Sequence, residues 1–425
     1  MKVKIYPLNE MISETQVCAS PFCLHLQIIC ASLAKGTSVI KNIVDSNDID
    51  TTIKWCEGLG ATIKRNNDRL IIKGVNNDLS YSQALFSCGN SSLTAKLMLP
   101  ILSTVSRPFG IKGDENILDE IESLTPFFES YGIHHYRENE MVRFENTMTS
   151  GEVEFDGDID IHLSAGILMA LPLLKGSSLF KLRAPVRCEK SYELILKILK
   201  NFKIDIKHPS TMRYEIPGFQ KYKKTKITTE IDNLYLSYLS LLTQKLPSGK
   251  NLKISNYKSN KYSNESKLFD FVCNNLATYS KVFPSKTLKK KEFSFSKVEY
   301  NVENSLPFLM ILGVINKQDT VITKVDFSNY RNKKQLAIIE KVFYKLDLPY
   351  YCYKNEIVVK PNKVKEKKQV DCKKDPYVAI AISFLALLSD CPIVIKHAEC
   401  VLDIYKDFYD NLKEYGATVE YIHDN

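Results

Sequence analysis

The most regular feature of this sequence is a recurring order of apolar and polar segments. An apolar strand is followed by a broken loop, an amphipathic helix, often a glycine-containing turn, and a hairpin. In the first copy the pattern predicts a strand over 36–44, a helix over 50–59 and a hairpin over 62–73. Further copies begin at the strands predicted over 108–112, 178–183, 251–256, 319–325 and 391–396. Because such a unit cannot bury its own apolar face, about six copies predict repeats that stack on one another.

A second set of helices precedes these strands and is apolar on nearly every face. They are expected over 21–34, 91–104, 160–173, 232–246, 304–315 and 375–388. Most begin at a polar or turn-favouring residue, which is typical of a helix start. A helix that is apolar all round is a buried helix. The pattern therefore predicts an α/β (α+β) fold with helices inside and sheets outside.

Length and composition fit a globular protein of two domains. The chain has 425 residues, of which 44% are hydrophobic and 25% are charged. Its longest apolar run, 377–388, is too short to cross a bilayer, and the first residues lack the apolar core of a signal peptide. The 11 cysteines are scattered singly, without a CxxC pair. We expect a cytoplasmic protein with reduced thiols, no bound metal, no cofactor and no membrane partner.

The net charge of +9 raises the question of a nucleic-acid partner. The lysine runs lie at 286–291 and 363–374, in segments expected to be loops between repeats. Neither run has the aromatic or glycine-rich neighbours that usually accompany nucleic-acid binding. The sequence therefore favours solvated loops and no nucleic-acid partner.

Two segments closely resemble the EPSP synthase (3-phosphoshikimate 1-carboxyvinyltransferase) family. They are residues 31–61 and the motif CGNSSLTAKL at 88–97. The likeness extends to residues 113–116, 167–176 and 381–392, and to the repeat count over the whole chain. It implies an inverse α/β barrel of βαβαββ-type repeats in two domains, 19–225 and 1–18 plus 226–425, each with three repeats. It also implies a monomer whose cleft between the domains holds phosphoenolpyruvate and shikimate 3-phosphate.

Each of those two substrates carries a phosphate and a carboxylate, so a site for both needs several cations. Enolpyruvyl transfer also needs a base and an acid. At the family's catalytic positions this sequence has other residues, so no catalytic residue is assigned. These positions hold Pro21, Glu120, Ser305, Asn332 and Asp403.

Several residues at substrate-contact positions of the family keep some capacity to bind an anion. These candidates are Ser20, Asn90, Ser91, Lys96, His162, Cys188, Arg331, Lys333 and Lys334. Asn90 and Ser91 equally fit a helix cap, His162 a buried or capping histidine, and Cys188 an inert thiol. The basic residues from Arg331 to Lys334 fit an anion site or a solvated helix start.

Three hypotheses follow from these observations. The favoured one is a non-catalytic or repurposed family member that keeps the scaffold and lacks the charges. The alternative is an active 3-phosphoshikimate 1-carboxyvinyltransferase of the shikimate pathway, with neighbouring lysines replacing the lost groups. A third is an RNA-directed relative, because RNA 3'-terminal phosphate cyclases share a related repeat and the chain is basic.

Overall fold

The computed structural model divides the chain into two compact units, described here separately. Unit 1 contains Met1–Cys18 and Ile231–Asn425, and unit 2 contains Ala19–Glu230. The boundary follows Glu230, whereas the sequence placed it after Thr225. The structure describes residues 1–76, 78–79, 84–157, 159–186, 188–247, 250–257, 264–282, 285–290, 294–300, 302, 304–327 and 329–422. The lysine run predicted as a loop at 286–291 falls partly outside these residues, and its described part, 286–290, lies in a strand.

Unit 2 contains three four-stranded sheets with the same strand arrangement. In each sheet an edge strand runs parallel to its neighbour, and two antiparallel strands follow. The first sheet is β14 (Lys226–Thr228), β3 (Thr37–Lys41), β5 (Arg69–Lys73) and β4 (Thr62–Asn66). The second is β6 (Leu85–Gly89), β7 (Phe109–Gly113), β9 (Met141–Glu145) and β8 (His134–Glu138). The third is β10 (Glu152–Asp156), β11 (Ser178–Arg183), β13 (Arg213–Ile216) and β12 (Lys207–Ser210).

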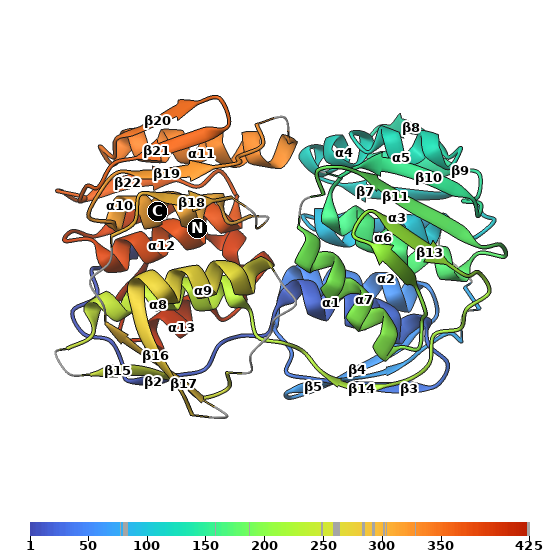
Figure 1. The fold of residues 1–425 in the computed structure, drawn as a ribbon, viewed down its shortest axis with the longest axis horizontal. Helices are drawn as coiled ribbons and strands as arrows, with labels where there is room; N and C mark the ends of the chain where they lie inside the picture. Colours follow the sequence, from blue (N-terminus) through green and yellow to red (C-terminus); the bar gives the residue numbers. More distant parts are fainter. Residues whose placement is uncertain are drawn as a thin grey trace. The chain divides into compact units, whose positions relative to one another are not determined.

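The helices of unit 2 fall into a buried set and an amphipathic set. The buried helices are α1 (Pro21–Leu33), α3 (Ser92–Leu102) and α6 (Ile161–Ala170), the last extended by the 3₁₀ turn η1 (Leu171–Leu173). The amphipathic helices are α2 (Asn47–Gly58), α4 (Glu115–Glu122), α5 (Thr125–Ser130) and α7 (Glu189–Asn201). Figure 1 shows the buried helices within unit 2, drawn in blue to green. Since they expose almost no side chain, their all-round apolar sequence is explained by burial.

Unit 1 repeats this plan, with two of its sheets completed by strands from the start of the chain. Its sheets are β22 (Lys368–Asp371), β23 (Ile393–Lys396), β1 (Lys2–Ile5) and β24 (Val419–Ile422); β16 (Ala277–Val282), β17 (Ser285–Lys290), β15 (Asn251–Ile254) and β2 (Glu14–Thr15); and β18 (Lys297–Glu299), β19 (Thr320–Thr323), β21 (Glu356–Val359) and β20 (Tyr350–Tyr353). Strand β1 pairs antiparallel with both β23 and β24. The last repeat of the sequence therefore depends on the first residues of the chain.

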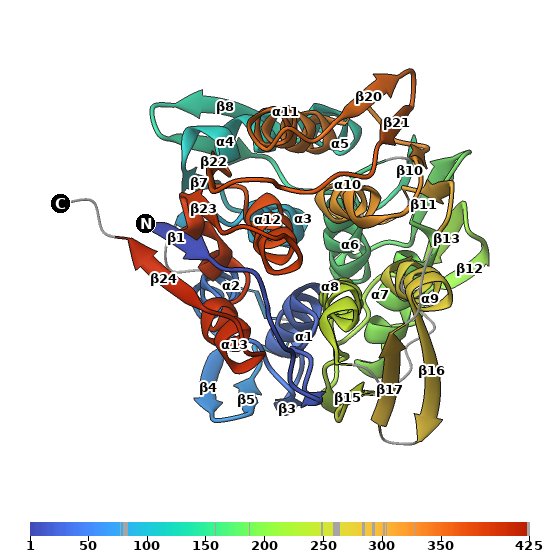
Figure 2. The ribbon, with the colours of Figure 1, turned by 90° about the vertical axis from the view of Figure 1, so that its left-hand side faces the viewer.

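The helices of unit 1 show the same division. The buried helices are α8 (Asn233–Leu241), continued by η2 (Leu242–Lys245), α10 (Leu306–Ile315) and α12 (Pro376–Leu388). The others are α9 (Asn264–Leu276), α11 (Tyr330–Lys345), η3 (Ala398–Asp403) and α13 (Phe408–Glu414). Figure 2 shows α8, α10 and α12 near the centre of unit 1, with strands toward its periphery. The predicted fold class, with helices inside and sheets outside, is confirmed.

Two local features bear on the sequence prediction. The amphipathic helix of the second copy, which follows its strand over 108–112, is two helices, α4 and α5. The break follows from Pro126, which lacks the N–H that a continuous helix would need. Gly60 and Gly416 have φ of +99° just beyond α2 and α13, where a side chain would be strained. The glycine-containing turns predicted there thus end their helices.

The chain passes between the units at two segments, and each segment is fixed within its own unit. In unit 2 the Ser20 N–H donates to the Glu230 carbonyl at 2.8 Å. In unit 1 the Asp232 N–H donates to the Cys18 carbonyl at 2.9 Å. Asp232 then begins α8 as its cap, accepting from the Tyr235 N–H at 2.8 Å.

Helices α3 and α6 approach closely because Gly166 has no side chain. A Cβ there would lie 2.7 Å from the Leu97 carbonyl oxygen and 2.8 Å from that of Lys96. We expect Gly166→Ala to lower the free energy of unfolding of unit 2 by about 1–3 kcal/mol, because backbone atoms cannot yield easily. Urea unfolding followed by circular dichroism measures this. Gly151→Ala is the control, since nothing lies within 4 Å of its added Cβ, and equal effects of the two changes would contradict the close approach.

Candidate functional site

The N-terminal ends of the buried helices in unit 2 are joined by polar side chains. Ser91 caps α3, accepting from the Thr94 N–H at 3.3 Å, and its hydroxyl donates to Thr94 Oγ1 at 2.8 Å. Thr94 Oγ1 lies 2.7 Å from Thr52 Oγ1 on α2, which lies 2.7 Å from His25 Nδ1 on α1. Three helices thus share one buried chain of hydrogen bonds.

Lys96, one turn into α3, forms a buried ion cluster with two carboxylates. Its Nζ lies 2.6 Å from Glu120 Oε1 on α4 and 2.5 Å from Asp160 Oδ2 at the start of α6. The side chains of Lys96, Glu120 and Asp160 are 6%, 8% and 16% exposed. An ammonium group this far from water needs such partners, because desolvating an unpaired charge is very costly.

Asp160 has a second structural task in the same cluster. Its Oδ1 accepts from the His162 N–H at 2.8 Å and from the Leu163 N–H at 3.1 Å, so it caps α6. Burial would raise the pKa of Asp160, but the charges of Lys96 and His162 and these hydrogen bonds hold it below its usual range. Asp160 therefore stays ionised opposite Lys96.

Two histidines lie beside the cluster. His162 Nδ1 is 3.5 Å from Asp160 Oδ1, and its ring meets Phe22 of α1 edge-on, with centroids 5.2 Å apart. His25 is 1% exposed, and burial, followed by the charge of His162, lowers its pKa to about 3. His25 is accordingly neutral at physiological pH and takes part through hydrogen bonding alone.

The other candidates in unit 2 lie at helix starts. Ser20 caps α1, accepting from the Cys23 N–H at 3.4 Å, and Pro21 is the first residue of that helix. Asn90 is exposed in the turn before α3. Cys188 precedes α7 with a φ of 55° and makes no side-chain capping bond. Ser20 and Ser91 thus act as caps, as the plainer interpretation of the sequence held for Ser91.

In unit 1, Arg331 near the start of α11 also faces a carboxylate. One terminal nitrogen of its guanidinium lies 3.5 Å from Asp375 Oδ2, whose side chain is 1% exposed, and its Nε donates to Asn304 Oδ1 at 3.0 Å. Gln335 Nε2 donates to the same Asn304 oxygen at 3.3 Å. Lys333 is exposed and Lys334 half-buried. Arg331 is therefore held by the protein itself.

The remaining candidate positions in unit 1 hold Ser305, Asn332 and Asp403. The buried Ser305 hydroxyl donates to the Val302 carbonyl at 2.6 Å. Asn332 accepts from the Tyr300 hydroxyl at 2.7 Å and donates to the Asp326 carbonyl at 2.9 Å. Asp403 is half-buried at the end of η3. Within the described residues, no group of three or more His, Cys, Asp and Glu side chains could hold a metal ion.

From the sequence, Lys96 is a candidate for binding an anion and Glu120 is a residue at a catalytic position of the family. The structure places them in contact, together with Asp160. The available signal was the presence of one lysine and two acids, Lys96, Glu120 and Asp160, at or near the starts of helices expected to be close to one another. The hydrogen-bonded chain from Ser91 to His25 had no signal, because its members are far apart in the sequence.

The buried cluster predicts that removing a buried carboxylate lowers the free energy of unfolding more than removing an exposed one. We expect Glu120→Gln to lower the free energy of unfolding by about 2 kcal/mol, since a charge-assisted hydrogen bond to a buried ammonium is lost. Asp119→Asn is the matched control on the same helix, because Asp119 is 56% exposed beside Arg137 and such pairs contribute about 0–1 kcal/mol. Urea unfolding compares the two variants, and an Asp119→Asn loss as large as that of Glu120→Gln would refute a buried role.

His25 predicts how stability depends on pH. Its folded pKa of about 3 lies below the unfolded value of 6.5, so the unfolded chain binds the proton first as pH falls. Its contribution to stability is complete above pH 6.5 and is lost below it, by up to about 1.4 kcal/mol per pH unit. We expect the free energy of unfolding to fall less steeply with decreasing pH in His25→Gln than in the unaltered protein, between about pH 6 and pH 4.5. His208→Gln on exposed β12 should leave the slope unchanged, and an unaltered slope in His25→Gln would contradict this.

Known proteins resemble this chain over nearly its whole length. The family model for EPSP synthase (3-phosphoshikimate 1-carboxyvinyltransferase) matches residues 6–412. The chain is 23% identical over 99% of its length to all of a 3-phosphoshikimate 1-carboxyvinyltransferase from Clostridium perfringens. It is 22% identical over 94% of its length to 95% of one from Methanococcus maripaludis.

Solved structures agree on the fold. The EPSP synthase of Acinetobacter baumannii matches with a TM-score of 0.76 at 16% identity, covering 99% of both chains. The enolpyruvyl transferase NikO from Streptomyces tendae matches with a TM-score of 0.75 at 12% identity, covering 99% of this chain and 98% of the other. With the family model spanning almost the entire sequence, the chain belongs to the EPSP synthase family.

Proposed function

We propose that this protein keeps the scaffold of the EPSP synthase family without catalysing enolpyruvyl transfer. The observation that carries the proposal is the position of Lys96 between Glu120 and Asp160. On this proposal the polar ends of α1, α3 and α6 stabilise unit 2 and do not hold an anionic substrate.

Simple electrostatics supports this reading of the cluster. Two unit charges 4 Å apart interact by about 4 kcal/mol at an effective dielectric constant near 20. A phosphate touching Lys96 would gain that attraction once and meet repulsion of similar size from two carboxylates. Their oxygens lie 2.6 and 2.5 Å from the same Nζ. An anion therefore gains nothing net from entering beside Lys96.

The residues at the positions of the general acid and base also argue against enolpyruvyl transfer. Ser305 and Asn332 stand where the family carries its catalytic carboxylates, by the resemblance of the sequence. A hydroxyl and an amide do not take up or release a proton near neutral pH, as a general acid or base must. Both are also engaged in hydrogen bonds within unit 1.

The alternative function is that of an active 3-phosphoshikimate 1-carboxyvinyltransferase. It is favoured by the names of the curated relatives, which match the chain over nearly its whole length. It would require other cations, such as exposed Lys333 and half-buried Lys334, to replace the lost groups.

A direct assay separates the two functions. We expect no enolpyruvylshikimate phosphate when the protein is incubated with phosphoenolpyruvate and shikimate 3-phosphate, followed by mass spectrometry and by phosphate release. The Clostridium perfringens relative serves as positive control in the same buffer. Turnover above background by this protein would establish the alternative.

Replacing Glu120 and Asp160 tests whether their charges keep an anion from binding beside Lys96. We expect Glu120→Gln with Asp160→Asn to release Lys96 and give calorimetric binding of shikimate 3-phosphate that the unaltered protein lacks. Asparagine still caps α6, and melting curves confirm folding before titration. Asp119→Asn with Glu122→Gln removes two carboxylates beside Arg137 and should give no gain. Binding by the unaltered protein would contradict the proposal.

A further inference from the structure

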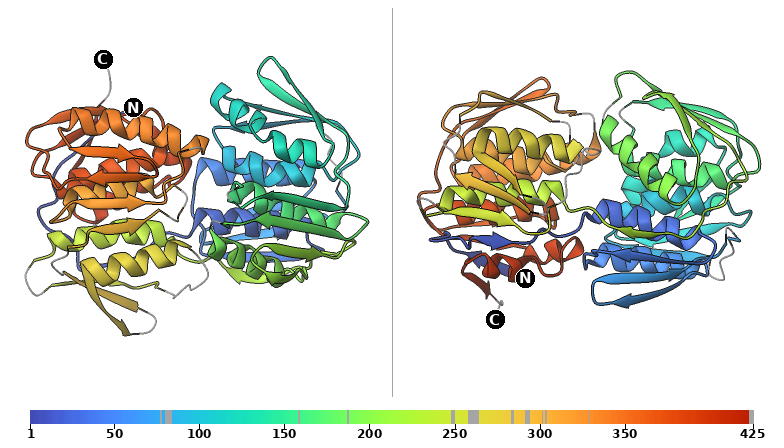
Figure 3. Two further views of the ribbon diagram at one scale, coloured as in Figure 1. Left: turned by 45° about the horizontal axis from the view of Figure 1, so that its top comes forward. Right: turned by 60° about the horizontal axis from the view of Figure 1, so that its bottom comes forward.

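The outer face of the sheet β14-β3-β5-β4 in unit 2 is strongly basic. Alternation along the strands directs Lys41, Lys64, Lys73 and Lys226 to this face, and all four are exposed. Neighbouring strands lie about 4.8 Å apart, so these ammonium groups share one surface. Figure 3 shows the blue hairpin of β4 and β5 at the periphery of unit 2.

The register places no acid among the outward positions of this sheet. One row reads Lys226, Val39, Ile71 and Lys64, the next Thr228, Lys41, Arg69 and Asn66, and the last Thr37, Lys73 and Thr62. Arg69 pairs with Asp68 of the hairpin turn at 3.1 Å. Within the described part of unit 2, the ammonium groups of Lys41, Lys64, Lys73 and Lys226 have no ion-pair partner.

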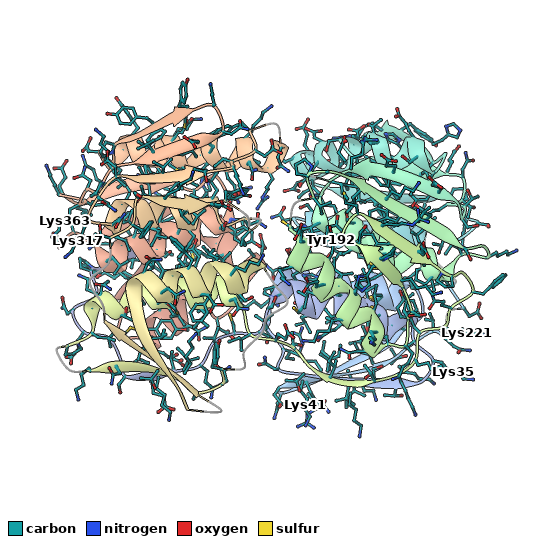
Figure 4. The ribbon with its side chains drawn as sticks, in the orientation of Figure 1. Lys35, Lys41, Tyr192, Lys221, Lys317 and Lys363 are labelled. Carbon is teal, nitrogen blue, oxygen red and sulfur yellow. The ribbon has the colours of Figure 1, made fainter. Side chains whose placement is uncertain are left out.

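Further lysines extend the basic face beyond the strand ends. Lys35 is bridged to Lys223 just before β3 and β14, and both are exposed. Gly36 packs against Lys224, since a Cβ there would lie 2.9 Å from its Cδ. Figure 4 shows Lys35, Lys41 and Lys221 pointing away from the body of unit 2, whereas Tyr192 lies within it.

This concentration does not reflect an excess of positive charge in unit 2. Residues 19–230 hold nearly equal numbers of basic and acidic side chains. Over residues 114–160 the only cations are Arg137 and Arg143 among many carboxylates, whereas over 197–226 the only anions are Asp205 and Glu215. Residues 35–78, which supply Lys41, Lys64 and Lys73, hold seven basic and six acidic side chains, so a general drift toward lysine does not account for the basic face. Gathering like charges on one face costs self-repulsion, so a partner that offsets it is indicated.

We propose that this sheet face binds the phosphate backbone of nucleic acid without reading its sequence. Lysine supplies the charge, and Thr37, Thr62, Thr228 and Asn66 supply hydroxyl and amide donors of the kind that contact phosphate oxygens. The apolar members Val39 and Ile71 are half-buried, so the face has no protruding apolar group to enter a lipid bilayer. No base-stacking aromatic side chain lies among the outward positions of its described strands, so the proposed contact is with the phosphate backbone and not with the bases. The proposal departs from the sequence-based expectation of no nucleic-acid partner, which considered only the lysine runs at 286–291 and 363–374.

The test is fluorescence anisotropy of the whole protein with a labelled duplex DNA of about 20 base pairs, titrated at several salt concentrations. We expect micromolar affinity at low salt that falls steeply as salt rises. Replacing Lys41, Lys64, Lys73 and Lys226 by glutamine should weaken binding at least tenfold and reduce the log–log salt slope by about 3–4. These side chains are exposed, so melting curves should stay unchanged.

Matched variants make the result specific to this face. Lys341, Lys345, Lys354 and Lys365 are exposed in unit 1, and replacing them by glutamine changes the net charge equally. Retained affinity in this control supports the proposal. Equal loss in both variants, or no binding by the unaltered protein, overturns it. Binding of the unaltered protein only to phosphatidylserine vesicles, lost in the first variant, would assign the face to a membrane and also overturn it.

Discussion

Burial of six helices that are apolar around their whole circumference is the constraint on which both units depend. Such a helix cannot lie at a surface, so each must be enclosed by sheets and by the amphipathic helices. Close packing follows, as at Gly166, where α3 and α6 meet backbone against backbone. The same contact brings Lys96 of α3 and Asp160 of α6 to one place. The geometry of the polar cluster is therefore a consequence of how the apolar helices pack.

Enclosing the helices also buries their N-termini, whose free N–H groups then need partners. Ser20, Ser91 and Asp160 supply them in unit 2, and Asp232 and Asp375 do so in unit 1. In a site that receives phosphates, such N–H groups would attract the ligand. Here side chains of the protein satisfy them, and carboxylates also take up the charge of Lys96 and Arg331. In both units, carboxylates of the protein itself therefore lie beside these cations.

The sequence predicted the buried helices within a few residues, because a run such as that of α12 has no polar face and allows no other placement. The fold class followed from the same periodicity. The ion cluster could not be predicted in this way, since Lys96, Glu120 and Asp160 belong to three helices and touch only after packing. Pro126 shows the limit of pattern alone, because the amphipathic run continues across it while the backbone hydrogen bonds cannot. The assignment of caps at Ser20 and Ser91 needed the actual hydrogen bonds.

Buried and exposed charges of unit 2 differ in how far they are paired with opposite charges. Inside unit 2, the buried Lys96 is paired with Glu120 and Asp160, because an unpaired buried charge is very costly. On the outside, some acids over residues 114–160 have an ion-pair partner, as Asp119 and Glu122 do in Arg137. The four lysines on the outer face of β3, β4, β5 and β14 are not paired in this way. Threonine occupies several equivalent outward positions of the same sheet, so the fold does not require lysine there. Lysine at those positions adds nothing to the packing of α1 or α2 beneath the sheet. The scaffold does not demand these charges, so the proposed phosphate-bearing partner gives a physical reason for lysine at these positions.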